Sequence, residues 1–334
     1  MSREVYIVLE TIVMLFLVIL SGLFLRKGKI LDKSSTTRVS KFVVDVAFPA
    51  LVFTSMVESI DSQTLARSWY LPIAGIAILA LSMAVSYFIT PLFKIDTQPA
   101  RGSAAFSMGT PNWLFIPLPI AAALYGARGE TIVFLVNAGA LIAFWSVGVW
   151  VVLGHKPDLA MMRKIALNPG LLATVFGILV ALLFPGAQML LNPDVTDLDF
   201  FSGALSMVFQ AIDFLGGVTV PLSMVVTGAL LGDEGIGDFL EPKVIIISFF
   251  RLIVFPAALI SLFYVALVFG LRLDQAVSMT LIIIAAMPVA VTCSVVAEKY
   301  RGDEALVSKG IFITTLISVV TVPVIVLIVE IIGL

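Results

Sequence analysis

The chain has 334 residues, of which 60% are hydrophobic and 13% are charged, and its net charge at pH 7 is −2. Soluble domains are only ~45–50% apolar and ~25% charged, so this many apolar side chains cannot be hidden in a water-soluble core. The weak net charge excludes a polyanion-binding protein, so no nucleic-acid partner is expected. A single cysteine, Cys293, and a single histidine, His155, exclude a disulfide framework and a Cys/His metal cluster, so we expect no metal and no other cofactor.

Ten apolar runs have about the length that a helix needs to cross the ~30 Å hydrocarbon core of a bilayer. They fall at residues 5–25, 42–57, 69–92, 103–124, 131–153, 166–186, 201–231, 244–270, 275–297 and 310–332. The first run is longer than a signal-peptide core and a basic loop follows it, so we expect it to be retained. The sequence therefore predicts an all-α polytopic membrane protein with ten transmembrane helices.

The loops between the predicted helices differ in their positive charge. The segments after the odd-numbered helices hold fifteen of the twenty Lys and Arg, whereas the opposite side holds only Arg3, Arg67, Arg128 and Arg272. Because Lys and Arg gather in cytoplasmic loops, the two termini are expected to be extracytoplasmic. The expected location is the cell membrane, with multiple passes through the lipid bilayer.

Two pairs of landmarks indicate an internal repeat. Pro49 in VDVAFPALV and Pro221 in GGVTVPLSMV lie 172 positions apart, and Arg128 and Arg301 lie 173 apart. Each half contains an odd number of helices, so the second half would cross the membrane in the opposite sense, as in many secondary transporters. The predicted division is a first five-helix repeat over 1–154, a cytoplasmic linker over 155–165 and a second, inverted repeat over 166–334.

Prolines mark the predicted binding site. Pro111, Pro117 and Pro119 interrupt the fourth helix and Pro288 interrupts the ninth, because proline removes a helix hydrogen bond and collides with the preceding turn. Broken helices at equivalent positions of two halves are typical of transporter sites. The amide groups exposed at the start of a half-helix carry partial positive charge, which favours an anion such as a carboxylate.

The candidate substrate-binding residues are Asn112, Pro117, Pro119, Pro288, Asn137, Pro49 and Pro221. The side-chain amide of Asn112 can donate a hydrogen bond to a substrate oxygen, or it can satisfy an unwound carbonyl without touching a ligand. Pro49 and Pro221 can shape the site directly or be ordinary kinks. These alternatives stay open at the level of the sequence.

Ionisable residues inside membrane helices are costly and usually functional, and here they are few. Asp45, Asp213 and Arg251 are the candidates for coupling to an ion. Arg251 would neutralise a substrate, pair with Asp45, or extend its charged end to the membrane surface. The sequence contains no Gly-rich nucleotide-binding loop, so energy is expected from an ion gradient, from the gradient of the substrate or from a partner. H⁺ and Na⁺ are the possible coupling ions.

Several segments resemble one family in order along the chain. The stretch GLFLRKGKILDKSSTTRVSKFVVDVAFPALVF is similar to the opening signature of the auxin efflux carrier family, and NWLFIPLPIAAALYG and MPVAVTCSVVAEKYRGDE resemble its fourth and ninth helices. On this match Asn112, Pro119 and Pro288 are positions of the family motifs. One departure is the stretch IPLP, which stands where the family often has glycine.

The resemblance implies two inverted five-helix repeats, with broken helices 4 and 9 crossing beside the substrate and helices 1, 2, 6 and 7 forming a scaffold. It also implies elevator-type transport of a small organic anion, such as malate, malonate or an auxin-like acid, by a bacterial or archaeal-type member. A homodimer through the scaffold helices is the expected assembly. The alternatives are a sodium-coupled bile-acid-type symporter and a non-transporting ligand sensor, and no enzyme is expected because only Asp45 and Asp213 could form a catalytic pair.

Overall fold

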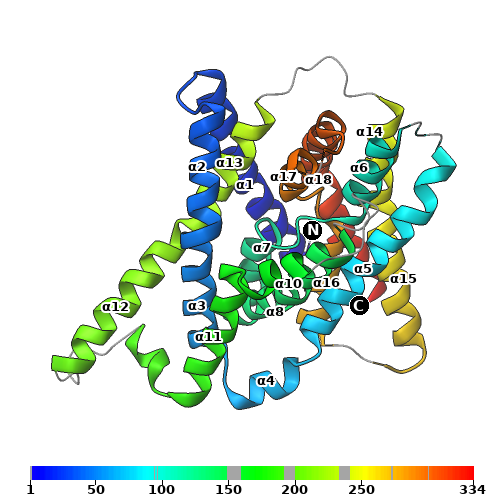
Figure 1. Ribbon diagram of the computed structural model, residues 1–334. Helices are drawn as coiled ribbons and strands as arrows, with labels where there is room; N and C mark the ends of the chain where they lie inside the picture. Colours follow the sequence, from blue (N-terminus) through cyan, green and yellow to red (C-terminus); the bar gives the residue numbers. More distant parts are fainter. Residues whose placement is uncertain are drawn as a thin grey trace.

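The computed structural model of the protein (Figure 1) describes residues 2–93, 95, 97–148, 159–191, 200–232, 241–271, 274–299 and 301–334. Its α-helices are α1 (Arg3–Lys27), α2 (Lys33–Phe42), α3 (Phe48–Ser59), α4 (Ser62–Ser68), α5 (Leu71–Ile89), α6 (Gln98–Gly109), α7 (Pro117–Tyr125), α8 (Ala127–Ala143), α10 (Leu159–Ala166), α11 (Pro169–Leu183), α12 (Phe200–Gly217), α13 (Thr219–Leu231), α14 (Pro242–Phe249), α15 (Phe255–Val268), α16 (Gln275–Ala286), α17 (Thr292–Lys299) and α18 (Glu304–Ile332). Three π-helical stretches are η1 (Val43–Ala47), η3 (Phe144–Gly148) and η6 (Phe250–Val254), and two 3-10 turns are η2 (Thr90–Phe93) and η4 (Ala187–Leu190).

The starts of many helices follow directly from the local sequence. Six helices are preceded by an N-cap residue whose side-chain oxygen accepts a hydrogen bond from the backbone N–H three residues later. These residues are Ser2, Asp32, Asp61, Asn168, Asp274 and Asp303. A cap of this kind satisfies one of the four backbone N–H groups that have no partner at the start of a helix.

Seven helical segments of the described chain are long and apolar enough to cross a membrane. They are Arg3–Lys27, Lys33–Ser59, Ser62–Phe93, Ala127–Gly148, Phe200–Leu231, Pro242–Val268 and Glu304–Ile332. Of the other three predicted spans, the sixth is the 15-residue α11, and the fourth and ninth are each divided into two short helices. The structure thus confirms a polytopic all-helical protein, whereas the count of ten spans and the inverted repeat stay predictions.

Two predicted boundaries differ in the structure. The second span begins at Lys33 rather than at residue 42, because Asp32 caps α2 and the helix continues through η1 into α3. Part of the predicted linker is also helical, since α10 starts at Leu159. The rest of that linker, including His155, lies outside the described residues.

The helices pack in two groups. In the first group, α1 packs along α13, and α3 packs against α11 and α12. In the second group, α5 packs against α6 and α8, α7 against α8, and α18 against α6, α14 and α16. Figure 1 shows the first group on the left and most of the second on the right. The groups meet where α1 contacts α7 and α18, and where α3 contacts α8 and α11 contacts α8.

Glycines allow the closest contacts within each group. A Cβ atom on Gly22 of α1 would lie 2.0 Å from the carbonyl oxygen of Val225, and one on Gly228 of α13 would lie 1.8 Å from that of Ile19. Small residues that let two backbones approach this closely are typical of helix pairs in membranes. Gly217 differs, because a Cβ atom there would meet open space.

Candidate functional site

The breaks in the fourth and ninth spans lie against each other. Residues 110–116 separate α6 from α7, and residues 287–291 separate α16 from α17. The backbone N–H of Asn112 donates to the carbonyl of Pro288 at 2.7 Å, and that of Ala290 donates to the carbonyl of Thr110 at 3.1 Å. These two bonds form a short antiparallel bridge between Pro111 and Val289. We call residues 110–116 and 287–291 the crossover.

The prolines explain why the helices stop at the crossover. Pro111 and Pro288 have no N–H to offer a helix, and both lie in the extended stretches. Pro117 occupies the first position of α7, where its missing N–H costs nothing and its fixed backbone angle suits a new helix. The amide of Val289 is satisfied by the hydroxyl of Thr314 on α18, at 3.0 Å. The predicted breaks at these prolines are therefore confirmed.

A small cavity of about 90 Å³ lies beside the crossover. It is lined by Val44, Phe48, Asn112, Trp113, Leu114, Phe115, Asn137, Leu141, Asn168, Ala290, Val291 and Thr292. Three asparagine side chains and one threonine provide its polar groups, and the remaining side chains are apolar or aromatic. We call this cavity the crossover pocket.

The asparagine oxygens of the crossover pocket are held by backbone or indole groups. Oδ1 of Asn112 accepts from the backbone N–H of Phe115 at 3.1 Å, and Oδ1 of Asn168 accepts from that of Leu171 at 3.1 Å. Oδ1 of Asn137 accepts from Nε1 of Trp113 at 2.8 Å. Each amide is thereby oriented with its oxygen engaged, so its NH₂ group is the end available to a ligand.

Two polar groups of the crossover pocket are buried without a hydrogen-bond partner among the described residues. They are Nδ2 of Asn137, whose residue is only 1% exposed, and Oγ1 of Thr292. A buried donor without a partner costs about 1–3 kcal/mol, so native proteins rarely keep one without a reason. Both residues line the crossover pocket, where a ligand with oxygen acceptors would offer a partner.

Three helices begin at the crossover pocket. Residues 112–115 precede the start of α7, Thr292 is the first residue of α17, and Asn168 is the N-cap of α11. Each helix start adds partial positive charge from its peptide dipoles, and none of the described side chains that line the pocket is charged. The backbone itself offers few free donors there, because Pro117 and Pro119 have no N–H and the N–H of Cys293 donates to the carbonyl of Ala290. The pocket is therefore electrostatically suited to an anion and offers amide and hydroxyl donors to its oxygens.

The predicted substrate-binding residues have different places in the structure. Asn112 and Asn137 line the crossover pocket, and Asn112 caps a backbone N–H rather than an unwound carbonyl. Pro117, Pro119 and Pro288 shape the adjoining backbone without lining the pocket.

Pro49 and Pro221 lie at helix starts in the first group. Pro49 follows the π-helical stretch η1 at the beginning of α3, next to the pocket residue Phe48, and Pro221 lies in the first turn of α13. Neither lines the pocket, so a part in substrate binding stays a prediction for both.

Arg251 is completely enclosed by the protein, with an exposed fraction of 1%. Nη1 donates to the carbonyl of Met108 at 3.0 Å, and Nη2 donates to the carbonyl of Ala285. The guanidinium also lies 5.2 Å from the ring centre of Phe255. Arg251 thus neither extends to the membrane surface nor pairs with Asp45 within the described chain.

The two acidic coupling candidates lie elsewhere. Asp45 is exposed on η1 and Asp213 is exposed on α12. Asp213 interacts electrostatically with Glu130 at the start of α8, which also interacts with Glu58. A role of Asp45, Asp213 or Arg251 in ion coupling stays a prediction.

Sequence reasoning missed several residues of the crossover pocket, namely Phe48, Trp113, Asn168 and Thr292. A signal for Asn168 exists, because an asparagine directly before Pro169 is a typical helix start. That signal locates a helix end but does not place it beside residues 112–115, more than fifty positions earlier.

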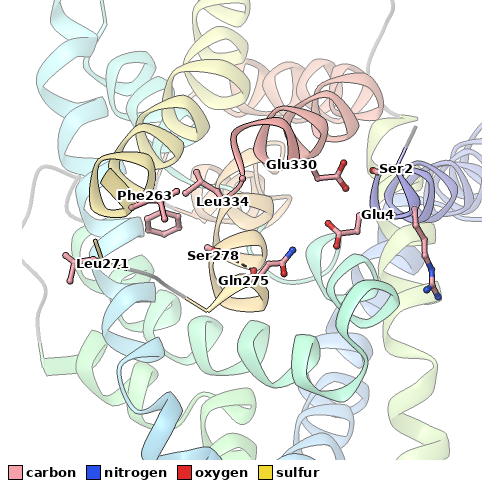
Figure 2. Close-up of a pocket in the computed structure, with 11 residues that line it drawn as sticks. Ser2, Glu4, Phe263, Leu271, Gln275, Ser278, Glu330 and Leu334 are labelled. Atoms are coloured by element: carbon pink, nitrogen blue, oxygen red, sulfur yellow. Dashed lines mark hydrogen bonds between the residues drawn. The ribbon is translucent and has the colours of Figure 1, made fainter. Parts of the chain in front are cut away.

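A larger cavity of about 830 Å³ lies near the two chain termini. Figure 2 shows the carboxylates of Glu4 on α1 and Glu330 on α18 extending into it, with Gln275 and Ser278 of α16 beneath them. None of its lining residues belongs to the crossover pocket. Arg3 also lines it, but the two carboxylates outnumber this one guanidinium and disfavour an anion, so the smaller cavity is the better candidate for the predicted ligand.

Comparison with known proteins also indicates a membrane transport protein. The model of the family described as membrane transport protein matches residues 7–159 and 153–326. The chain is also 23% identical, over 94% of its length and 96% of the relative's, to an uncharacterized transporter of Methanothermobacter thermautotrophicus. The two family matches together cover nearly the whole chain, so this protein belongs to the membrane transport protein family, the family of the auxin efflux carriers.

Proposed function

We propose that this protein is a secondary active transporter of a small organic anion, a mono- or dicarboxylate such as malate, malonate or an auxin-like acid. The observation that carries the proposal is the crossover pocket, where the starts of α7, α11 and α17 meet without a charged side chain. Partial positive charge with free donors and no counter-charge favours a carboxylate over a cation or a neutral solute.

The dimensions of the crossover pocket support a small substrate. Its 90 Å³ corresponds to about three water molecules at ~30 Å³ each, which is room for a carboxylate group and a few attached atoms. The side chains of Phe48, Trp113 and Leu141 offer apolar contact to the rest of the molecule. A longer substrate would require the pocket to open.

The position of the crossover pocket between the two helix groups supports an elevator-type mechanism. Val44, Phe48 and Asn168 come from the first group, whereas the crossover residues, Asn137 and Leu141 come from the second. In the proposed cycle, the second group carries the anion across the membrane against a stationary first group. A homodimer through the first group, residence in the cell membrane and extracytoplasmic termini complete the proposal.

Uptake of labelled malate, malonate and indole-3-acetate into proteoliposomes tests this function, with H⁺ and Na⁺ gradients imposed separately. We expect gradient-driven uptake of at least one carboxylate, and a strong reduction in the Asn112→Ala variant. Gln210→Ala is the matched control, because it also removes an amide side chain but lies exposed on α12, outside the crossover pocket.

Each other outcome has a distinct meaning. Uptake of a bile-acid-type anion that requires sodium would favour the sodium-coupled symporter. Binding of a carboxylate with no flux under either gradient would favour a non-transporting sensor. Uptake that is identical in Asn112→Ala and in the wild type would remove the crossover pocket as the binding site.

A further inference from the structure

The C-terminal ends of α6 and α16 meet at the side chain of Arg251. α6 ends at Gly109 and α16 ends at Ala286, and the guanidinium donates to the carbonyls of Met108 and Ala285, one residue before each end. Arg251 itself belongs to η6, a π-helical stretch of a different span. One side chain therefore ties together the last turns of the two half-helices that lead into the crossover.

The charges around this contact balance. The C-terminal end of a helix carries roughly −0.5 of an elementary charge, so two such ends carry about −1. The described partners of Arg251 are these carbonyls and the ring of Phe255, and no carboxylate is among them. Its Nε is buried without a hydrogen-bond partner among the described residues. The single positive charge of the guanidinium is thus matched by the two helix ends rather than by an acid.

The same helix ends are a cation site in other transporters with broken helices, where unwound carbonyls and half-helix C-terminal ends coordinate Na⁺. A metal ion at this place would have to share the carbonyls of Met108 and Ala285 with a fixed positive charge. The face of Phe255 also lies beside the guanidinium and favours a cation there.

We propose that Arg251 is a built-in cation that takes the place of a bound sodium ion at the C-terminal ends of α6 and α16, so that the crossover is complete without a metal cation. Arg251 is then a positioning residue, since it fixes the half-helices whose continuations, α7 and α17, begin at the crossover pocket. For the proposed function, the inference removes the C-terminal ends of α6 and α16 as a sodium site.

Thermal unfolding of the purified full-length protein tests the inference without any substrate, so a failure here is distinguishable from a failure of the proposed transport. Melting temperatures are measured in choline, sodium, lithium and low millimolar guanidinium chloride for the wild type, Arg251→Ala and Arg251→Lys. Arg101→Ala is the matched control, because Nε of Arg101 also donates to a backbone carbonyl, that of Ile95, but its side chain is only partly buried.

We expect the melting temperature of the wild type to be the same in choline, sodium and lithium. Arg251→Ala should melt lower, and guanidinium should raise its melting temperature in a saturable manner, because the ion fills the vacated position. Arg251→Lys keeps the charge and should lie between the two, since an ammonium lacks the fixed fork of two donors. Arg101→Ala should show no gain from guanidinium.

Uptake in proteoliposomes, measured per folded protein and well below the melting temperature of each variant, separates positioning of the half-helices from loss of stability. In choline, Arg251→Ala should lose roughly tenfold or more in rate, the order of one hydrogen bond to a charged group, and guanidinium should restore it. Three results would overturn the inference. Sodium raises the melting temperature of the wild type above its value in choline, Arg251→Ala has the melting temperature and uptake rate of the wild type in choline, or guanidinium changes neither quantity in Arg251→Ala. Should Arg251→Ala fail to fold, Arg251→Lys decides: sodium-dependent melting in that variant overturns the inference, and sodium-independent melting supports it.

Discussion

The C-terminal and N-terminal helix ends at the crossover differ in whether a side chain of the protein neutralises their partial charge. The C-terminal ends of α6 and α16 receive a buried guanidinium, whereas the N-terminal ends of α7, α11 and α17 surround a pocket lined by uncharged side chains. The first arrangement is neutral and closed, because the charge of Arg251 is fixed to the protein. The second has unmatched partial charge and free donors, which is the condition for binding a ligand from outside. Under the proposed function, the closed side of the crossover positions the half-helices and the open side receives the substrate.

The largest effect is expected from placing a charge on the open side. Asn112→Asp keeps the shape of the side chain and the oxygen that accepts from Phe115, but adds a negative charge beside the substrate. Two like charges ~4 Å apart repel by about 4 kcal/mol at an effective dielectric constant near 20. We therefore expect anion uptake to fall by up to roughly 1000-fold.

Initial uptake rates and the melting temperature of the same preparation check this prediction. The fold should survive, because the oxygen that accepts from the backbone N–H of Phe115 is retained. Normal anion uptake by Asn112→Asp would break the comparison, since the open side would then tolerate a negative charge.

A smaller loss is expected from removing one donor of the crossover pocket. Asn137→Ala deletes the free Nδ2 group and also leaves Nε1 of Trp113 without its acceptor. A buried substrate oxygen that loses its donor costs about 1–3 kcal/mol of binding free energy, so KM should rise by roughly tenfold or more.

Trp113→Phe separates the two consequences of this change. It deletes the indole donor but keeps Nδ2 of Asn137, so the effect on KM should be clearly weaker than that of Asn137→Ala. Equal KM values in the two variants would mean that the Trp113–Asn137 bond, and not the free donor, is what matters.

Adding a methyl group at a tight contact in the first helix group tests packing without changing any charge. A Cβ atom on Gly216 would lie 2.7 Å from the Cα of Leu51 in α3, whereas one on the neighbouring Gly217 would meet open space. Overpacking of this kind costs about 1–3 kcal/mol, so Gly216→Ala should lower the melting temperature.

Gly217→Ala is the matched control on the same helix, α12. Alanine has the higher helix propensity, so stability should be unchanged or rise by up to about 1 kcal/mol. Equal melting temperatures for the two variants would contradict the close packing of α12 on α3.

The smallest effect is expected from an ion pair at the surface. Nη2 of Arg128 lies 2.6 Å from Oδ2 of Asp274, but the side chains are 63% and 39% exposed. Exposed pairs contribute only about 0–1 kcal/mol, so Arg128→Ala should scarcely change thermal unfolding. A loss as large as that of Arg251→Ala would show that burial is not what makes Arg251 important.

The sequence predicted the crossover better than it predicted the residues around it. Pro111, Pro117 and Pro288 predict helix breaks because proline cannot continue a helix, and this constraint does not depend on tertiary contacts. The position of Asn112 at this break also followed from the sequence, whereas its contact with a substrate stays a prediction. Asn168 was missed because its role depends on the start of α11 lying beside the crossover, which is a long-range contact.

The start of the second span was placed wrongly for a different reason. Residues 33–41 are polar and were predicted to be a loop, yet Asp32 caps a helix that continues through them into the second span. Polar side chains do not prevent a helix outside the hydrocarbon, so apolar length alone sets the span too short. The cap itself was readable as an Asp before a polar, helix-compatible stretch.

The sequence by itself determined that this is a polytopic helical protein of the membrane transport family with two broken helices, and it predicted a preference for an anion. Those conclusions follow from apolar run lengths, proline chemistry and the polarity of helix ends, all of which are local. Only the tertiary structure decided which helix ends meet. It placed the starts of α7, α11 and α17 around one pocket and brought Arg251 to the ends of α6 and α16, because contacts between distant segments are set by how whole helices pack.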